Sequence, residues 1–418
     1  MRIAVIGGGI AGLSAAWLLQ QRHQIVLYEA AGYLGGHTNT VDVQLDGASH
    51  PVDTGFLVHN DLTYPNLIRL FEHLGVETYE SDMSFSVRLP DQDIEWAGSN
   101  IATVFGQKRN LLRLHFWRML QEIIRFNSRA PQMLQWSEQR RATLGQLLDV
   151  RGYSEFFRNS YLLPMAAAIW SASPWEILRF PAATFLRFCL NHRLLQIEGR
   201  PQWRSIVGGG RSYVEKMASG LDVRLHQPVR EVVRDKGVVQ VRCRDGTAEY
   251  DAVIFATHAP DTLRILKQPD ARESEILGAV RYQPNLAILH TDRRFLPRRE
   301  SLWSAWNYLS QGDASRSVCV TYLLNRLQRL PFKTPLMVTL NPAPDQMPRQ
   351  ELRRFHYDHP VFDQQAIDAQ ARLDGIQGNN RSWFCGAWCG YGFHEDGLKS
   401  ALRIAGDFGV EAPWPVVL

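Results

Sequence analysis

The sequence contains no long apolar run among its 418 residues. A membrane-spanning helix needs about 18 consecutive apolar residues, whereas the best candidate, Tyr161 to Trp170, is shorter and contains Pro164. The apolar stretch at residues 1–19 looks only superficially like a signal peptide, because its glycines and its periodicity fit the first strand and helix of a domain. These features predict a cytoplasmic protein and leave peripheral contact with the inner membrane surface open.

Cysteine is scarce, and neither sign of charge dominates. The five cysteines are an odd number without a CxxC pair, so we expect neither a disulfide framework nor a bound metal. The 46 Lys and Arg against 42 Asp and Glu give no argument for nucleic-acid binding, which needs basic charge focused into a stripe. The length predicts two domains with room for a large core.

The N-terminal segment has the pattern of a dinucleotide-binding unit. Ile3 to Ile6 form a short apolar run typical of a strand in a parallel sheet, and Leu13 to Gln20 favour a helix. Between them lies Gly7-Gly8-Gly9-Ile10-Ala11-Gly12. Gly7 permits a sharp turn, Gly9 a close approach of pyrophosphate, and Gly12 close packing of helix on strand. We expect N–H groups at the helix start, around Ile10 and Ala11, to bind the phosphates.

A second strand and an acidic residue complete this unit. The predicted strand from Ile25 to Tyr28 ends at Glu29, 20 residues after Gly9. A carboxylate at this position accepts hydrogen bonds from an adenosine ribose, and its charge would repel the 2′-phosphate of NADP. The order and spacing of these parts therefore predict dinucleotide binding.

The residues after Glu29 favour FAD over NAD. They read Ala30-Ala31-Gly32-Tyr33-Leu34-Gly35-Gly36-His37-Thr38, and a simple NAD-binding unit does not require this second glycine pair. Here the chain resembles the flavin amine-oxidase superfamily, which includes phytoene desaturases and protoporphyrinogen oxidases. The resemblance implies that the segment brings FAD-binding groups to the cofactor at Ala30, Gly35, Gly36, His37 and Thr38. His37 stands where the superfamily usually has Arg.

Four further segments resemble the same superfamily in the same order. Val52 to Phe56 is similar to its strand beside the flavin, which implies contacts from Gly55 and Phe56. Gln227 to Val232 is similar to the strand whose valine, here Val229, contacts adenine. Asp251 to His258 is similar to the strand and turn that return to the cofactor, which implies a contact from Ala256.

The last similar segment lies near the C-terminus. Trp383 to Ala387 and Gly392 to Gly397 resemble the final flavin-binding strand and helix start. The resemblance implies contacts from Gly386, Phe393, His394 and Glu395, with helix N–H groups pointing at the flavin pyrimidine, where negative charge develops. Ala387 replaces an acid that usually lies near the pyrophosphate. Covalent attachment through Cys385 or Cys389 is the less favoured alternative, because free cysteines are commonly small buried apolar residues.

The resemblance implies an α/β fold of the amine-oxidase and protoporphyrinogen-oxidase type. A Rossmann-like, three-layer FAD domain is expected at residues 1–80, 205–280 and 375–418. It would be interleaved with an α+β substrate domain at residues 81–204 and 281–374.

A narrower resemblance concerns the substrate. The strings HTNTVDV, HPVDTGFLVHN, TYPNLIRLFEHLGV and DMSFSV are similar to a bacterial group of amine-oxidase-like proteins. That group is similar to the flavoprotein domain of plant cyclopropane-fatty-acid synthases. The resemblance implies a fatty-acyl or phospholipid substrate and a lipid methyltransferase as partner, by association, because the chemistry of a site determines function.

Residues 81–204 are the predicted wall of an apolar tunnel. Helical spacing places on one face Leu112, Phe116, Met119, Leu120 and Ile123. The same stretch is basic, with Lys108, Arg109, Arg113, Arg118 and Arg125. A second aromatic and basic segment runs from Arg179 to Arg204. The favoured interpretation is a core-facing stripe with solvated charges outside, and the alternative is a helix lying on an anionic membrane surface.

No catalytic triad is visible, and the expected chemistry does not need one. Flavin oxidases and desaturases accept a hydride or its equivalent at the flavin N5, while the protein positions the C–H bond and excludes water. His394 is the candidate catalytic residue, because an imidazole there would tune the flavin or move a proton. A structural histidine at a helix start is an equal alternative. His59 and Asn60 are weaker candidates for the substrate side.

The leading hypothesis is an FAD-dependent oxidoreductase that acts on an apolar substrate, in a desaturase-like or dehydrogenase-like reaction. Two alternatives stay open from the sequence. One is a non-catalytic flavin-containing protein that presents lipid to a methyltransferase. The other is an amine or amino-acid oxidase, which is disfavoured because no aromatic pair can be assigned to an amine-binding cage.

Overall fold

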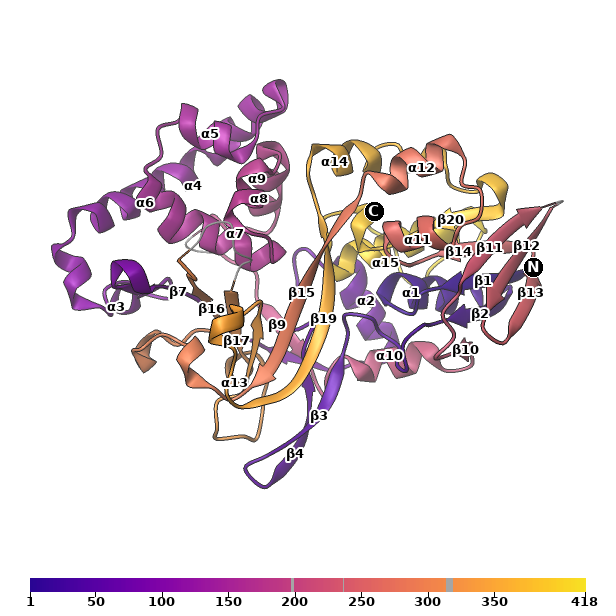
Figure 1. Cartoon of the computed structure of the whole chain (residues 1–418), viewed down its shortest axis with the longest axis horizontal. Helices are drawn as coiled ribbons and strands as arrows, with labels where there is room; N and C mark the ends of the chain where they lie inside the picture. Colours follow the sequence, from indigo (N-terminus) through magenta and orange to yellow (C-terminus); the bar gives the residue numbers. More distant parts are fainter. Residues whose placement is uncertain (197–198, 236, 313–318) are drawn as a thin grey trace.

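The computed structural model describes residues 1–196, 199–235, 237–312 and 319–418. They form two lobes, with the labelled N- and C-termini both in the first and most of the helices α3 to α9 in the second (Figure 1). Among the described residues, no helix combines the length and the apolarity that crossing a bilayer requires.

The first lobe is built on a parallel sheet in the order β10-β2-β1-β14-β20. The central strands β1 (Arg2–Ile6), β2 (Gln24–Tyr28) and β14 (Ala252–Phe255) are almost wholly buried. Such apolar runs are typical of parallel strands that are covered on both faces. The outer strands are β10 (Asp222–Arg224) and β20 (Ser382–Phe384). All five strands lie within the ranges that the sequence analysis assigned to the cofactor domain.

Two layers cover this sheet and complete the predicted three-layer arrangement. One consists of mutually packed helices: α1 (Ile10–Leu19), α2 (Pro65–Leu74), α10 (Arg211–Ala218) and α15 (His394–Asp407). The other combines two helices with an antiparallel sheet: β11 (Glu231–Asp235), β12 (Val238–Cys243), β13 (Gly246–Tyr250), α11 (Ala259–Ile265) and α12 (Ala271–Gly278). The predicted strand from Gln227 begins only at Glu231, because the segment around Pro228 follows the cavity wall instead.

The second lobe contains a seven-stranded mixed sheet in the order β19-β15-β18-β17-β16-β7-β8. Its strands are β7 (Phe85–Leu89), β8 (Ile94–Ala97), β15 (Arg281–His290), β16 (Trp306–Leu309), β17 (Cys319–Leu323), β18 (Met337–Leu340) and β19 (Glu351–Val361). A short helix, α13 (Leu324–Leu327), follows β17. The long pair of β15 and β19 runs between the lobes (Figure 1).

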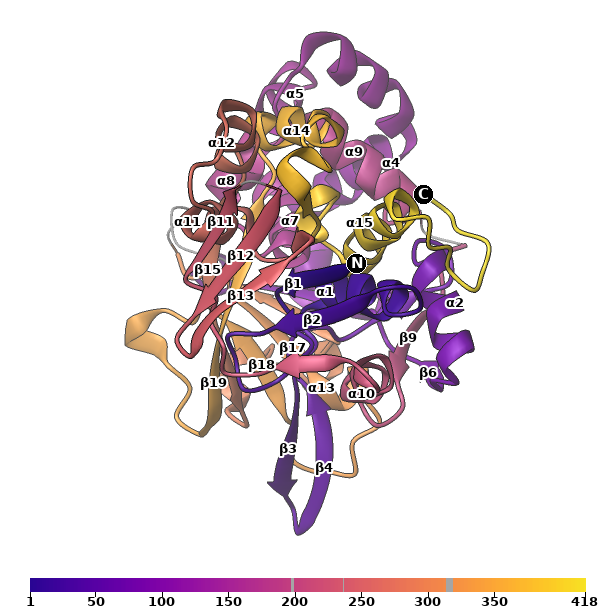
Figure 2. The same cartoon turned by 90° about the vertical axis from the view of Figure 1, so that its right-hand side faces the viewer.

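Helices cover the far end of this lobe (Figures 1 and 2). They are α3 (Ile101–Val104), α4 (Leu114–Arg140), α5 (Leu144–Val150), α6 (Glu155–Phe157), α7 (Leu163–Trp170), α8 (Pro174–Arg179) and α9 (Ala182–Asn191). In α4, Phe116 and Met119 are fully buried, as the core-facing interpretation predicts. The placement of Leu112 on that face is wrong, because α4 begins only at Leu114 and Leu112 ends a separate 3-10 turn.

Smaller elements connect the lobes. The hairpin of β3 (Thr40–Leu45) and β4 (Ala48–Asp53) projects from the molecule (Figure 2). A short sheet joins β5 (His59–Asn60), β6 (Thr78–Glu80) and β9 (Trp203–Ile206). The predicted segment Arg179 to Arg204 supplies α9 and the start of β9, and residues 197–198 within it lie outside the described part of the chain.

One predicted domain range needs a correction. Helix α14 (Gln364–Gln370) falls in the range expected for the substrate domain, yet it packs on α12 of the first lobe. Ala369 and Leu373 are buried in the same core as Leu277, so burial of apolar surface holds this segment in the first lobe. The change of lobe therefore lies before α14, and the other ranges stay predictions.

Candidate functional site

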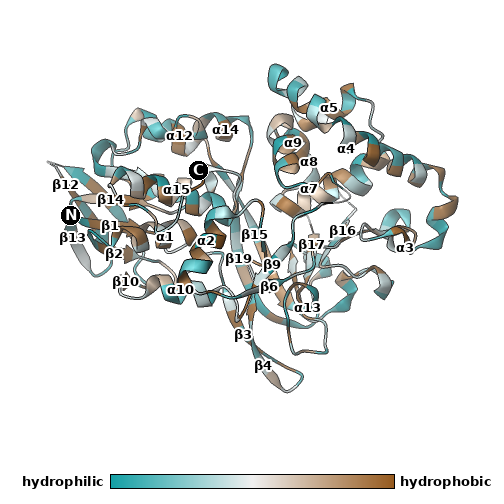
Figure 3. Ribbon diagram, turned by 180° about the vertical axis from the view of Figure 1, so that it is seen from behind, coloured by the Kyte–Doolittle hydropathy of each residue, from teal (hydrophilic) through white to brown (hydrophobic). Residues whose placement is uncertain are grey.

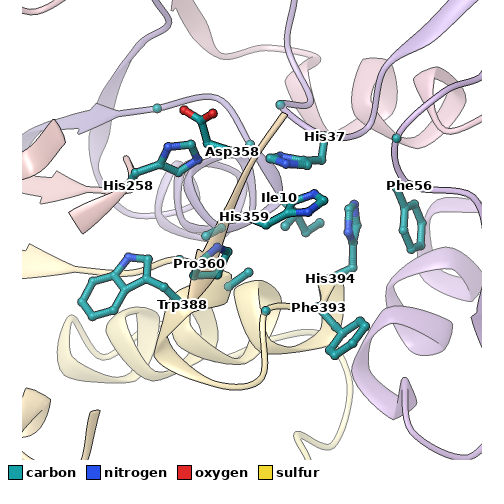
Figure 4. A pocket seen from close by; sticks show the side chains of 18 of the residues that line it. Ile10, His37, Phe56, His258, Asp358, His359, Pro360, Trp388, Phe393 and His394 are labelled. Carbon is teal, nitrogen blue, oxygen red and sulfur yellow. The ribbon is translucent and has the colours of Figure 1, made fainter. Parts of the chain in front are cut away.

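A cavity of about 540 Å³ lies between the parallel sheet of the first lobe and the second lobe. The first lobe contributes loops that follow its parallel strands, and the second contributes side chains of α7, α9, β16, β17 and β19. Ligands of open parallel sheets bind outside the carboxyl ends of the strands, which is where these loops lie. Figure 4 shows part of the lining from close by.

The glycine-rich turn after β1 has the geometry that its sequence predicts. Gly7 has φ +108°, and a Cβ on it would lie 2.7 Å from the Ala256 carbonyl oxygen. A Cβ on Gly12 would lie 1.9 Å from the Gly7 carbonyl oxygen, so Gly12 serves the packing of α1 on β1. A Cβ on Gly9 would meet nothing within 4 Å, because Gly9 faces the open cavity. Gly9 thus leaves space for a ligand at the N-terminus of α1, which begins at Ile10.

Glu29 lies at the end of β2 and lines the same cavity. One oxygen of its carboxylate accepts a hydrogen bond of 2.7 Å from the Gly8 N–H, and the other accepts one of 2.7 Å from the Ala31 N–H. Each carboxylate oxygen keeps a free lone pair for a hydroxyl donor. Ala30, Val229 and Ala256 line the cavity as well, as the sequence analysis expects.

The second glycine pair lies directly against the first turn. The Gly35 N–H donates to the Gly8 carbonyl oxygen at 2.8 Å, and a Cβ on Gly36 would lie 3.1 Å from the Gly9 Cα. Both residues have positive φ, +113° and +59°, which favours glycine. The two glycine segments are separate in the sequence but adjacent in space. Their backbones together line one part of the cavity, which we call the glycine cradle.

His394 and Phe56 form a stacked pair at the start of α15 (Figure 4), with ring centroids 3.5 Å apart and an interplanar angle of 12°. The His394 Nε2 lies 2.7 Å from the Thr38 Oγ1, and that oxygen lies 2.6 Å from the Tyr213 hydroxyl. Burial, together with a smaller effect of the nearby His59, lowers the pKa of His394 to about 3. The imidazole is therefore uncharged at neutral pH and its orientation is fixed by Thr38.

Three more histidines gather beside this pair: His37, His258 and His359 (Figure 4). The ring of His37 lies 5.3 Å from that of His359 and 6.4 Å from that of His258. Burial lowers the pKa of all three, to about 4 for His359 and well below the ordinary value for His37, and mutual repulsion adds to this for His37 and His359. The cavity is thus lined by neutral imidazoles.

Not every predicted cofactor contact reaches the cavity. Gly12 and Thr38 lie behind the lining, where Gly12 packs α1 and Thr38 holds His394. The Glu395 carboxylate turns away and accepts hydrogen bonds from the backbone N–H groups of Asn66 (3.1 Å) and Leu67 (3.0 Å), at the N-terminus of α2. A carboxylate is favoured at that end of a helix, which explains its direction. The other predicted contacts line the cavity: Gly7, Gly9, Ile10, Ala11, Glu29, Ala30, Gly35, Gly36, His37, Gly55, Phe56, Val229, Ala256, Gly386, Phe393 and His394.

The weaker sequence candidates lie outside the lining. His59 and Asn60 are buried in β5 behind it. Cys385 is fully buried, and burial raises the pKa of its thiol to about 12, so it is not a thiolate nucleophile. No cluster of three or more His, Cys, Asp or Glu side chains in the described ranges is arranged to hold a metal ion.

Aromatic and aliphatic side chains of the second lobe close the far end of the cavity. They are Met83, Ile169, Trp170, Phe188, Leu194, Trp203, Trp306 and Tyr322. Trp170 and Phe188 pack with ring centroids 4.7 Å apart, and Phe188 stacks on Phe393 at 5.1 Å. His192 also lies here, stacked on Phe188 at 3.9 Å, and burial lowers its pKa to about 4. We call this part of the cavity the aromatic chamber.

The chain matches the family model described as flavin containing amine oxidoreductase over residues 10–355. The chain belongs to this family. Its cofactor is FAD, because the family contains a flavin and because Glu29 and the glycine cradle have the features that bind an adenosine diphosphate. The protein is therefore an FAD-dependent oxidoreductase.

The names of individual similar proteins refer to different substrates. The chain is 27% identical over 325 residues to the carotenoid phi-ring synthase of Streptomyces griseus, covering 72% of this chain and 59% of that protein. It is 25% identical over 324 residues to polyamine oxidase 2 of Arabidopsis thaliana, covering 72% of this chain and 60% of that protein. The aligned part thus spans less than two thirds of either relative.

A solved structure has the same fold along nearly the whole chain. The CLA-producing fatty acid isomerase from P. acnes superposes with a TM-score of 0.70 at 14% identity, covering 98% of this chain and 99% of that one. At this identity the likeness establishes the fold of the flavoprotein and says nothing about its substrate.

The cavity of this flavoprotein fits FAD. Glu29 and Val229 would hold the adenosine half, Gly9 and Gly36 would border the pyrophosphate, and Phe56 and the α15 N-terminus would face the flavin ring. The open space above Gly9 is the observation that supports this fit, because only there does the turn admit a bulky group. His37 and Ala387, which depart from the usual residues of the superfamily, both line the cavity without blocking it.

Proposed function

We propose that this FAD-dependent oxidoreductase dehydrogenates an apolar substrate, with a fatty-acyl chain as the first class to test. The observation that carries the proposal is the aromatic chamber, in which no described lining residue is a carboxylate, a lysine or an arginine. The charged lining residues lie instead near β2, α11 and His258: Glu29, Asp261, Arg264 and Asp358. An apolar chain would enter the chamber without leaving a buried charge unpaired.

An amine substrate fits the chamber less well. A protonated amine loses its hydration on entry, and without a carboxylate it gains only cation–π contacts, about 2 kcal/mol when desolvated. The name of one similar protein, a carotenoid ring synthase, is in keeping with an apolar substrate. The name of polyamine oxidase 2 points to the alternative.

The protein residues have separable roles in this proposal. The bound flavin supplies the acceptor for the hydrogen and its electron pair. Trp306 and Trp170 would position the substrate C–H bond and exclude water. His394, kept neutral by burial and held by Thr38, would orient groups at the flavin edge without adding a positive charge. A partnership with a lipid methyltransferase stays a prediction.

Anaerobic reduction of the bound flavin tests the proposal. The purified protein is mixed with fatty acids, with a phospholipid extract and with a panel of amines, and the loss of visible flavin absorbance is followed. We expect reduction by a lipid and a rate about tenfold lower for Trp306→Ala, equivalent to 1.4 kcal/mol of lost positioning. Trp175→Ala, which changes an exposed tryptophan on α8, is the matched control. Reduction by an amine but by no lipid would overturn the proposal.

A further inference from the structure

Large apolar side chains are exposed together at one end of the helical lobe. Leu112, Leu114 and Ile101 are 87%, 85% and 79% exposed. We define the α3–α4 tip as these three residues together with Leu111, Trp117 and Ile124, which are also exposed. It lies at the end of the molecule farthest from β1 (Figures 1 and 3).

The tip is one surface and not a set of scattered residues. The Trp117 indole N–H donates to the Leu111 carbonyl oxygen at 2.9 Å. The Trp117 ring also lies 5.0 Å from that of Phe105, which is one helical turn from Ile101. Leu114, Trp117 and Ile124 follow at intervals of three and seven residues, so they share one face of α4.

This face of α4 is opposite to the face that packs in the core. Phe116, Met119 and Phe126 are fully buried, and at 100° per residue they point away from Leu114 and Trp117. The solvent side of a helix is normally polar. A contiguous group of large apolar residues there marks an interaction site.

Basic residues surround the tip. Residues 98–137 contain six Lys and Arg residues, namely Lys108, Arg109, Arg113, Arg118, Arg125 and Arg129, against a single acidic residue, Glu122. The Glu122 side chain is buried, accepts hydrogen bonds from Ser154, and lies 3.6 Å from Arg118 and 3.5 Å from Arg125. Arg109 and Arg113 share the carboxylate of Asp93, at 3.4 and 3.8 Å. The six basic residues outnumber these two acidic partners, so the segment keeps a net positive charge.

We propose that the α3–α4 tip docks the protein on an anionic membrane surface. The leucines, Ile101 and Trp117 would enter the boundary between lipid headgroups and acyl chains, while the basic side chains contact lipid phosphates. A second copy of the chain is a poor occupant, because a symmetric contact would bring two positive surfaces together. This inference does not depend on the substrate proposed above.

Helix α4 connects the tip to the wall of the cavity. Helix α4 packs on α9, which carries Phe188 of the aromatic chamber and is followed directly by His192. Arg187 of α9 is paired at 2.5 Å with Glu138, near the end of α4 opposite the tip, so the chamber wall lies roughly 35 Å along the helix from the docked surface.

Vesicle flotation of the full-length, flavin-loaded protein tests the proposal. We expect the protein to float with vesicles of equal parts phosphatidylglycerol and phosphatidylcholine, and to float much less with phosphatidylcholine alone. The double variant Leu112→Glu/Leu114→Glu should lower the bound fraction at least about tenfold. The double variant Arg109→Gln/Arg118→Gln should lower it about fivefold for each charge removed.

A matched control adds the same charges elsewhere. Val150→Glu/Leu352→Glu alters two exposed apolar residues outside the tip and should float like the unaltered protein. Retained flavin absorbance in every variant shows that the fold is intact. The proposal is overturned if the unaltered protein does not float, if the Leu112/Leu114 variant floats equally well, or if that variant instead abolishes a concentration-dependent self-association.

Discussion

Gly9 and Gly12 are three residues apart in the same motif and have different roles, because Gly9 faces the open cavity and Gly12 faces the Gly7 carbonyl oxygen. Gly9→Ala should fold with unchanged thermal stability, because its backbone at φ −72° suits alanine and its Cβ meets no protein atom. The methyl group should still weaken FAD binding by about tenfold or more, which is 1.4 kcal/mol. Gly12→Ala should instead destabilise the fold by about 1–3 kcal/mol, because its Cβ would overlap the Gly7 carbonyl.

Thermal unfolding and flavin titration of the two apoproteins separate these effects. Equal flavin affinity of Gly9→Ala and the unaltered protein would show that the pyrophosphate does not approach this turn. Unchanged stability of Gly12→Ala would show that α1 does not pack on β1 as closely as described.

His359 should make the apoprotein less stable in mild acid. Burial lowers its pKa from 6.5 to about 4 in the folded state. Below about pH 6.5 the His359 imidazole is therefore protonated in the unfolded chain but not in the folded chain. The free energy of unfolding consequently decreases as the pH falls. The loss should be about 1 kcal/mol at about pH 5.5. His359→Asn should remove this contribution.

Chemical denaturation of the unaltered apoprotein and of the His359→Asn apoprotein, at neutral and at mildly acidic pH, measures the contribution of His359 to stability. Comparison with the variant is needed because Asp53 and Asp396, whose pKa is raised to about 6 by burial, act in the opposite direction. They take up protons in the folded state and add stability below pH 6. Parallel pH profiles for the unaltered protein and His359→Asn would contradict the prediction.

At the scale of elements, Glu395 joins α15 to α2. Its carboxylate accepts the Asn66 and Leu67 backbone N–H groups, and it also accepts from the Asn66 side chain at 2.7 Å. Glu395→Ala should lower the free energy of unfolding by about 2 kcal/mol, because it leaves buried donors unpaired. Glu72→Ala, on the exposed side of α2, is the control. If Glu395→Ala lost flavin affinity with unchanged stability, its side chain would be a cofactor ligand after all.

Elements whose signals are local could be predicted from the sequence, and those that depend on distant pairing could not. The turn at Gly7 to Gly12 and the acid at Glu29 are separated by one helix, so their spacing determines their geometry. His258 and His359 come together with His37 only through the register of β14 and β19 with their neighbours, which no local pattern encodes.

The helical lobe shows the same limit. Periodicity correctly predicted the buried face at Phe116 and Met119. It placed Leu112 wrongly, because the helix is interrupted at Arg113, between the 3-10 turn that ends at Leu112 and α4, which begins at Leu114. Apolar spacing alone determines helix ends poorly. The predicted aromatic segment Arg179 to Arg204 supplies Phe188 and Trp203 to the aromatic chamber, but their convergence with Trp306 needs the folded second lobe.

For the whole molecule, FAD should act as an internal bridge. The cavity lining joins segments as distant as Glu29, Val229, Trp306 and His394, while the apolar cores lie in separate clusters on the two faces of the sheet and in the second lobe. Removing FAD should therefore lower the melting temperature of the entire chain. Because FAD binds only the folded state, each tenfold rise in free FAD above its dissociation constant should add about 1.4 kcal/mol of stability.

Scanning calorimetry of the apoprotein at increasing FAD concentrations measures this coupling. We expect one cooperative transition in the flavin-loaded protein, with the second lobe separating as an earlier transition when FAD is absent, since fewer contacts then cross between the lobes. Leu112→Glu/Leu114→Glu should leave the FAD-dependent shift unchanged, because the α3–α4 tip lies far from the cofactor. A melting temperature independent of FAD would mean that the cavity binds its cofactor without linking the segments that line it.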